Sequence, residues 1–336
     1  MLQHCSMIPG IPSSGSSSSS TWEPMSAPEL IQALTDDTTW DLHPYLVPLA
    51  VSDQKEYICA LRNPSDELSL TNKADWPLVF TTTTQQHGYQ WLALNAEQFM
   101  QRLVIAHETE KQSQMEILLS LYNDGATAPY TAGAAQQFPY GPDKYTLLKV
   151  GPFTDLYQAV AWSHWKDRQD EASALIAAET CQTKCSTPMG HHSLFYAQLL
   201  SQCPNRAEEA RDAARTCLRL PLSTLVDTKL PFMETTPAWQ DVVVDLGELT
   251  SSSSNDSHAI VREWYFKIKQ AESSQPRQDD DKTPQQKAVE RANDLLDLAV
   301  LDKTPYRKVR EEVADCLREA ELWDMADAIY PLNTAA

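Results

Sequence analysis

The sequence predicts a mainly α protein, α+β overall, with a small N-terminal mixed α/β domain followed by stacked antiparallel helical hairpins. Segments before residue 95 alternate apolar and polar side chains, as half-buried strands do. From residue 150 onward apolar residues instead recur at steps of three and four, as on one face of a helix. Runs rich in Ser, Pro and Gly separate these parts and set the predicted boundaries.

Composition divides the chain into four predicted parts. These are a disordered Ser-rich tail (1–25), a small α+β domain (26–122), an aperiodic linker (123–143) and a helical-hairpin domain (144–331). Two polar low-complexity runs, 250–258 and 273–283, predict solvated insertions between helices.

Three segments of the N-terminal part are predicted strands: 55–64, 76–84 and, with less regular alternation, 88–94. In the first, Tyr57, Cys59 and Leu61 fall on one face. Asn95 is then expected to cap one helix running through residue 122.

The helical part begins with two predicted pairs. Thr154 is the expected N-cap of the first helix (154–167), and a second helix (171–181) follows at once. The second pair (192–203 and 206–220) is separated by Pro204-Asn205, and its Ala-rich face would let a neighbouring helix approach closely.

Two Thr-Pro pairs mark the C-terminal helices. Thr283-Pro284-Gln285-Gln286 predicts a capping box with Pro at the first helical position. Thr304-Pro305 predicts the start of the next helix, and ELWDMADAIY (321–330) closes the series. Helices joined by short turns pack as antiparallel hairpins. The stack is tetratricopeptide-like in character, although no period near 34 residues carries that full consensus.

The charge balance limits the partners. Asp and Glu outnumber Lys and Arg by 46 to 27, so the net charge is −19. This negative charge argues against nucleic acid and anionic lipid as general partners, because both are negatively charged themselves. A protein with a basic surface is the favoured partner. No run approaches the ~20 consecutive apolar residues of a membrane span, so only peripheral membrane association stays open. Seven scattered cysteines indicate free thiols in a reducing compartment: Cys5, Cys59, Cys181, Cys185, Cys203, Cys217 and Cys316.

Motifs for cofactors and catalysis are missing. The nine glycines include no Gly-Gly or Gly-x-Gly pair, which excludes a Rossmann fingerprint, a kinase loop and a P-loop. There is no Gly-x-Ser-x-Gly elbow either. The sequence therefore predicts no catalytic residue, no cofactor and no metal ligand.

One group of side chains has residue types that can bind a metal: Cys181, Cys185, His191 and His192. Its C-x3-C-x5-HH spacing lies outside the usual zinc patterns. If Cys181 ends one helix and His191 opens the next, both could face one loop; the plainer interpretation is a polar connection with buried thiols. Cys217 lies on an apolar helix face and is interpreted as a core residue.

The remaining polar and aromatic candidates have structural interpretations. Three histidines are isolated in sequence: His87, His107 and His258. An alternating-charge helix face predicts a solvated surface with salt bridges: Arg206, Glu208, Glu209, Arg211, Asp212 and Arg215. The Asp279–Asp281 run lies in a low-complexity loop. Most tryptophans of the helical part are expected in the core, with one or two as interface anchors: Trp162, Trp165, Trp239, Trp264 and Trp323.

The helical part also carries a resemblance. The run 146–225, densest at EEARDAARTCLRLPL, resembles a poorly characterised protein family of plants and algae, and 283–330 resembles the C-terminal part of that family. Members are generally taken to be plastid proteins, so the resemblance implies a plastid location and no reaction. The first Lys or Arg is Lys55, so the chain is not expected to begin with a basic transit peptide.

Three functions fit these observations. The leading hypothesis is a non-catalytic interaction protein, an assembly or stability factor that binds its partner in a groove between helices. The alternative is an enzyme with an unrecognised site in the cleft between the two halves. A permanent structural subunit of a larger complex is the third, and an exposed Trp-rich apolar patch would favour it.

Overall fold

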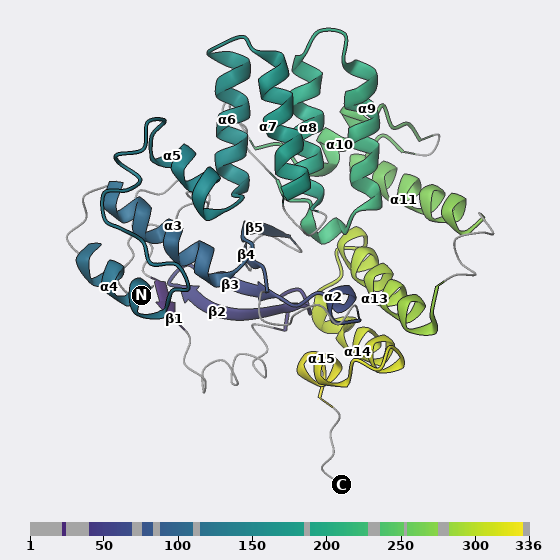
Figure 1. Ribbon diagram of the computed structural model, residues 1–336. Coiled ribbons are helices and arrows are strands. Elements are labelled where there is room, and N and C mark those ends of the chain that lie inside the picture. The colour runs from purple at the N-terminus through teal and green to yellow at the C-terminus, as the bar shows by residue number, and fades with distance from the viewer. Residues whose placement is uncertain are drawn as a thin grey trace.

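The computed structural model describes residues 22–24, 40–68, 76–82, 88–109, 115–184, 189–227, 236–251, 254–274 and 282–331. It confirms a mainly α protein with a small mixed start, in which helices cover an antiparallel sheet (Figure 1). No helix within these ranges is both long and apolar enough to span a membrane.

The described strands form one antiparallel sheet in sequence order, β1-β2-β3-β4-β5. The predicted strands are confirmed as β3, β4 and β5, while β1 and β2 were missed. Strand β1 lies within the predicted Ser-rich tail (1–25) and pairs with β2, so the tail was predicted to extend too far. In β2, Pro48 interrupts the alternating pattern, and the register with β3 shifts between Pro48 and Ala50. The bounds are β1 (Trp22–Pro24), β2 (Leu46–Ser52), β3 (Glu56–Leu61), β4 (Leu78–Thr82) and β5 (Tyr89–Ala93).

Both faces of the sheet are covered, and β3 is buried along its whole length. Tyr57, Cys59 and Leu61 pack into one core cluster, so their predicted common face is confirmed. Ile58 and Ala60 point into a second cluster on the opposite face.

The second cluster is covered by α3 (Ala96–Thr109) and α4 (Met115–Gly125), which pack against each other. The single helix predicted over this stretch is therefore wrong; the intervening EKQSQ offers no apolar residue to continue the stripe. The expected Asn95 cap is present, since its Oδ1 accepts from the Gln98 N–H at 2.9 Å. After α4 the chain forms turns that pack against α3. There the hydroxyl of buried Tyr130 donates a hydrogen bond to Glu108 at 2.6 Å.

Four helices stand side by side in the middle of the chain (Figure 1). The prediction that Thr154 is the N-cap of the first of these helices is wrong. Phe153 is the N-cap, and the Thr154 hydroxyl lies 2.7 Å from Nε2 of His192. After α5 (Pro142–Tyr145) and η2 (Thr146–Val150), the four are α6 (Thr154–Lys166), α7 (Glu171–Lys184), α8 (Gly190–Gln202) and α9 (Ala207–Thr216).

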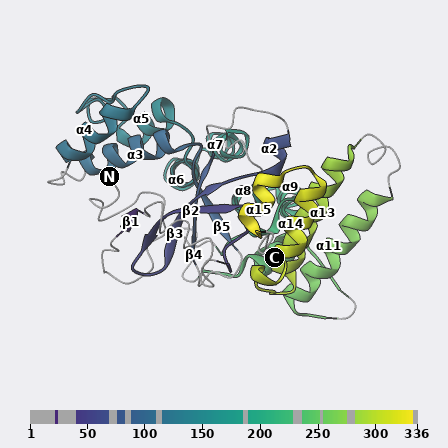
Figure 2. The same ribbon diagram turned by 90° about the horizontal axis from the view of Figure 1, so that it is seen from below.

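The C-terminal helices pack on the other side of the sheet from α3 and α4 (Figure 2). The capping box is confirmed: Thr283 Oγ1 accepts from the Gln286 N–H at 3.2 Å, and Gln286 Oε1 accepts from the Thr283 N–H at 2.9 Å. The remaining elements are α2 (Pro64–Leu68), η3 (Cys217–Arg219), η4 (Leu222–Thr224), α10 (Trp239–Leu246), α11 (Ser257–Ser273), α13 (Pro284–Leu301), η5 (Tyr306–Lys308), α14 (Arg310–Glu319) and α15 (Trp323–Ile329).

The helix predicted from Thr304-Pro305 was placed too early. Pro305 precedes the 3-10 turn η5, and α14 begins at Arg310. The turn places the Tyr306 ring in the core, where it is only 1% exposed, before the α-helix starts.

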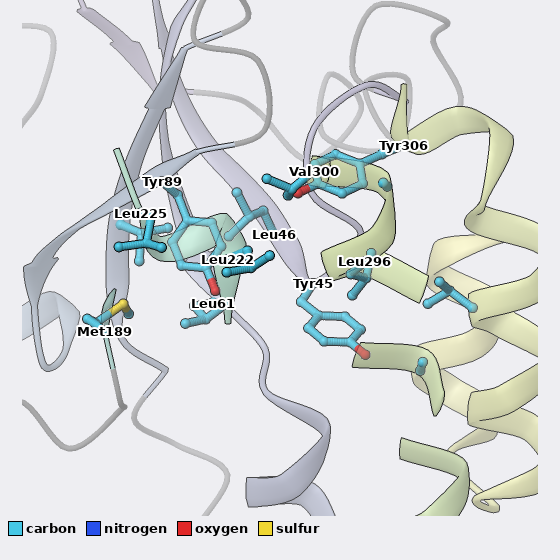
Figure 3. Packing of buried hydrophobic residues seen from close by; sticks show 14 of the residues in the cluster. Tyr45, Leu46, Leu61, Tyr89, Met189, Leu222, Leu225, Leu296, Val300 and Tyr306 are labelled. Atoms are coloured by element: carbon cyan, nitrogen blue, oxygen red, sulfur yellow. The ribbon is translucent and has the colours of Figure 1, made fainter. Parts of the chain in front are cut away.

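One hydrophobic core joins the sheet to the C-terminal helices. Side chains from β2, β3, β5, η4, α13 and η5 meet in it (Figure 3), among them Leu46, Leu61, Tyr89, Leu222, Leu296 and Tyr306. Because these elements come from both ends of the sequence, the N-terminal and C-terminal parts are expected to unfold together.

Candidate functional site

A pocket of about 1030 Å³ lies where the sheet meets η4, α11 and α13. It is large enough for a ligand or a short peptide segment. Its walls combine apolar and aromatic side chains with ionisable groups from six regions of the sequence: 43–45, 61–66, Tyr89, 219–223, 266–273 and 282–297.

Asp297 is the most deeply buried acid of this pocket, only 7% exposed. Its Oδ1 accepts from the Leu222 N–H at 2.8 Å, and its Oδ2 accepts from the Tyr265 hydroxyl at 3.2 Å. Burial raises the pKa of the Asp297 carboxyl to about 7, although the hydrogen bond from Leu222 and the Lys269 charge oppose the rise.

Asp294 lies one helical turn before Asp297 and therefore on the same side of α13. Its Oδ1 is 2.7 Å from Nζ of Lys269, and that ammonium is 5.4 Å from the centroid of the Tyr265 ring. Burial and the two neighbouring carboxylates raise the pKa of the Tyr265 hydroxyl, which is therefore a neutral donor.

His43 is surrounded by three aromatic rings. Its ring centroid lies 5.1 Å from Tyr45, 5.2 Å from Tyr89 and 5.1 Å from Tyr306. Its Nδ1 accepts from the Tyr45 N–H at 3.2 Å, which fixes that nitrogen as unprotonated. Burial raises the pKa of Tyr89 to about 12 and that of Tyr45 well above its ordinary value, so both phenols stay neutral.

The mouth of the pocket is more open and carries ion pairs. Arg219 pairs with Glu272 at 3.7 Å and Lys282 with Glu290 at 2.7 Å. Phe266, 42% exposed, adds an apolar edge from α11. The pocket thus has a mixed rim, an aromatic wall and one buried carboxyl that titrates near neutrality, an arrangement that can accept hydrogen bonds and hold positive charge.

The Asp297 pKa gives a testable pH dependence. The carboxyl titrates near 3.8 when exposed and near 7 when folded, so the folded state binds the proton more tightly and loses stability as the pH rises from about 4 to about 7. Between pH 5 and 7 the wild type should lose about 2 kcal/mol of unfolding free energy relative to Asp297→Asn, which carries no such proton. Urea unfolding at both pH values measures this; parallel pH profiles for the two proteins would contradict it.

The Cys/His constellation is brought only partly together. His191 and His192 are buried with ring centroids 4.2 Å apart, and His191 Nδ1 is 3.1 Å from the Thr224 carbonyl oxygen. Burial lowers the pKa of His191 to about 4 and that of His192 well below 6.5. Cys181 is buried, whereas Cys185 lies outside the described residues. Across the described ranges, no group of three His, Cys, Asp or Glu side chains is placed to hold a metal ion.

The other candidates lie apart from the pocket. Cys217 is fully buried, and burial raises its thiol pKa to about 12, which fits a core residue. His107 is buried and His258 half-buried, while His87 and the Asp279–Asp281 run fall outside the described residues. On α9, Arg206 pairs with Glu209 at 2.7 Å at the surface, as the charge pattern predicts.

The prediction that most tryptophans of the helical part lie in the core is wrong. Only Trp239 is buried, at 6% exposed, and Trp323 is 55% exposed. The other three are half-buried and pack against the edges of the core: Trp162, Trp165 and Trp264. The rings of Trp162 and Trp165 stack with centroids 5.1 Å apart, and the centroid of the Trp264 ring lies 5.3 Å from the Arg215 cation and 5.0 Å from the Lys267 cation.

The sequence predicted a functional role for none of the residues that line this pocket. They come from positions up to about 250 residues apart, and no local spacing connects them. One signal was present: Asp297 interrupts the apolar run LLDLAV at a position that faces the core beside Leu296 and Val300. A charged residue on the buried stripe of an amphipathic helix is costly and merits attention.

Three family models match consecutive parts of the chain. The model described as PAB N-terminal matches residues 34–148, PAB middle domain matches 154–237 and PAB C-terminal domain matches 263–332. The EEARDAARTCLRLPL stretch lies within the middle match. No solved structure gives a significant match.

The chain is also homologous to a curated protein of Arabidopsis thaliana named "Protein IN CHLOROPLAST ATPASE BIOGENESIS, chloroplastic". The two are 26% identical over 295 residues, which cover 86% of this chain and 78% of the relative.

Proposed function

We propose that this chain is a plastid assembly factor that takes part in the biogenesis of the chloroplast ATPase and acts by binding a protein, not by catalysis. The observation that carries the proposal is the Arabidopsis relative, whose name refers to chloroplast ATPase biogenesis and whose similarity extends over 86% of this chain. The three consecutive family matches support a relation along most of the chain rather than in one shared segment.

The pocket beside η4, α11 and α13 is where we place the partner. Its floor belongs to the core that joins sheet and helices, so the site is supported by rigid elements. Its volume of about 1030 Å³ can enclose a peptide segment, which a flat surface could not do. We therefore place the partner at the junction of sheet and helices, where the cleft between the two halves was expected, and not in a groove between helical hairpins.

A catalytic role for the same pocket would rest on Asp297, whose pKa of about 7 suits proton transfer. Both of its oxygens already accept hydrogen bonds, from Leu222 and Tyr265. Burial keeps the neighbouring phenols of Tyr89 and Tyr265 neutral, so they act as hydrogen-bond donors and not as nucleophiles. Binding is the better-supported role.

The experiment is to disrupt the gene and quantify assembled chloroplast ATPase, with re-expression of the wild-type chain as the control. Assembled ATPase should fall several-fold and return on re-expression, while unrelated plastid complexes keep their levels. An unchanged ATPase level in the disrupted line would refute the assembly role.

A further inference from the structure

The charge of Asp297 is left without a close counter-ion inside the pocket. In the part of the chain that the structure describes, no Lys or Arg nitrogen lies within the 4.0 Å of an ion pair to this carboxyl, and Lys269 acts on it only from farther away. The cations that line the pocket are each paired with other acids: Arg219 with Glu272, Lys269 with Asp294 and Lys282 with Glu290. A buried carboxylate in this situation gains from any cation that reaches it.

The wall around Asp297 is suited to a cation. Tyr45 and Tyr89 present buried rings to the pocket, and an ammonium or guanidinium is attracted to the face of such a ring. The protein already holds one cation in this way, since Lys269 lies 5.4 Å from the Tyr265 ring centroid and 2.7 Å from Asp294. The apolar residues Leu61, Leu220 and Leu296 could pack along the methylene groups of a long side chain.

The size of the pocket points to a peptide as the carrier of the cation. About 1030 Å³ exceeds what one Lys or Arg side chain fills, so room remains for flanking residues. The net charge of −19 attracts a basic segment from a distance.

We propose that this pocket binds a Lys or Arg side chain from an extended segment of a partner protein, with Asp297 as its counter-charge. The inference rests on the proposed function, because it names the feature of the partner that the assembly factor recognises. The aromatic wall and the leucines then contact the stem and the neighbours of that side chain.

The test uses the full chain and fluorescence anisotropy of a labelled peptide, Gly-Leu-Arg-Leu-Gly, beside the same peptide with citrulline in place of arginine. Citrulline keeps the shape and loses the charge. The wild type should bind the arginine peptide at least tenfold more tightly, and Asp297→Asn should lose that preference. Glu208→Gln removes the same charge from an exposed position on α9 outside the pocket and should keep it.

A second pair of variants protects the test against misfolding of Asp297→Asn. Gln270 is exposed and lines the pocket mouth, whereas Ala271 is exposed on α11 but does not line it. Gln270→Lys should weaken arginine-peptide binding at least threefold, and Ala271→Lys, which has the same net charge, should not. Equal binding of the two peptides by the wild type would overturn the proposal. A full arginine preference in Asp297→Asn would overturn it too, as would arginine-peptide binding by Gln270→Lys as tight as that by Ala271→Lys.

Free spermidine serves as the competitor. Binding of spermidine as tight as that of the peptide would assign the pocket to a small cation and overturn the peptide proposal. Loss of assembled ATPase in the disrupted line together with no arginine preference would leave the proposed function standing and sink this inference alone. A clear arginine preference together with an unchanged ATPase level would refute the proposed function and leave the arginine-binding pocket standing.

Discussion

Replacing Arg310 by Met is expected to lower the free energy of unfolding by about 4 kcal/mol, because three backbone carbonyls lose a charged donor at once. The guanidinium donates to the carbonyl oxygens of Trp40 at 2.8 Å, Leu42 at 2.9 Å and Ile329 at 3.3 Å. Burial lowers its pKa to about 10, so it still carries its charge at neutral pH. It thereby ties the chain entering the sheet to the end of α15.

Urea unfolding followed by circular dichroism measures the effect. Arg307→Met is the matched control, since that side chain is 53% exposed and its ion pair with Asp41 spans 3.6 Å, which should be worth less than about 1 kcal/mol. A loss below about 1 kcal/mol for Arg310→Met would contradict the role given to these three hydrogen bonds.

Replacing Leu222 by Ala is expected to cost about 3–5 kcal/mol, the range for truncating a fully buried leucine. Leu222 has no exposed surface and lies in η4 between the sheet and α13 (Figure 3). Because its cluster includes residues of both ends of the chain, circular dichroism and tryptophan fluorescence should report one shared transition at lower urea.

Leu148→Ala provides the comparison for this substitution. Leu148 is 68% exposed on η2, so the same truncation should change the unfolding free energy by less than about 0.5 kcal/mol. Similar losses for the two variants, or separate transitions of sheet and helices in Leu222→Ala, would show that the core is not shared.

Much of the secondary structure could be predicted because its signals are local. The alternation around Tyr57, Cys59 and Leu61 identified β3, and the Thr283–Gln286 capping box identified the start of α13. Errors arose where a tertiary contact outweighed a local preference. Thr154 resembles a cap, yet its hydroxyl lies at hydrogen-bonding distance from His192, 38 residues away.

The pocket could not be predicted, because its residues share no spacing. Asp297 accepts from Leu222, 75 residues earlier, and the Tyr45 hydroxyl donates to Asn293, 248 residues later. Only the folded chain brings these side chains together. The resemblance to a plant and algal family pointed to the plastid independently of the pocket, and the chloroplastic relative agrees with it.

The most direct measurement is the recovery of assembled chloroplast ATPase in the gene-disrupted line when variants of the pocket mouth are expressed. If the chain acts by binding its partner in this pocket, Ala271→Lys should restore assembly as the wild type does, and Gln270→Lys, expressed at the same level, should restore less than half of it. Full recovery with Gln270→Lys would contradict the account, because the added charge lies at the mouth of the only site to which partner binding has been assigned.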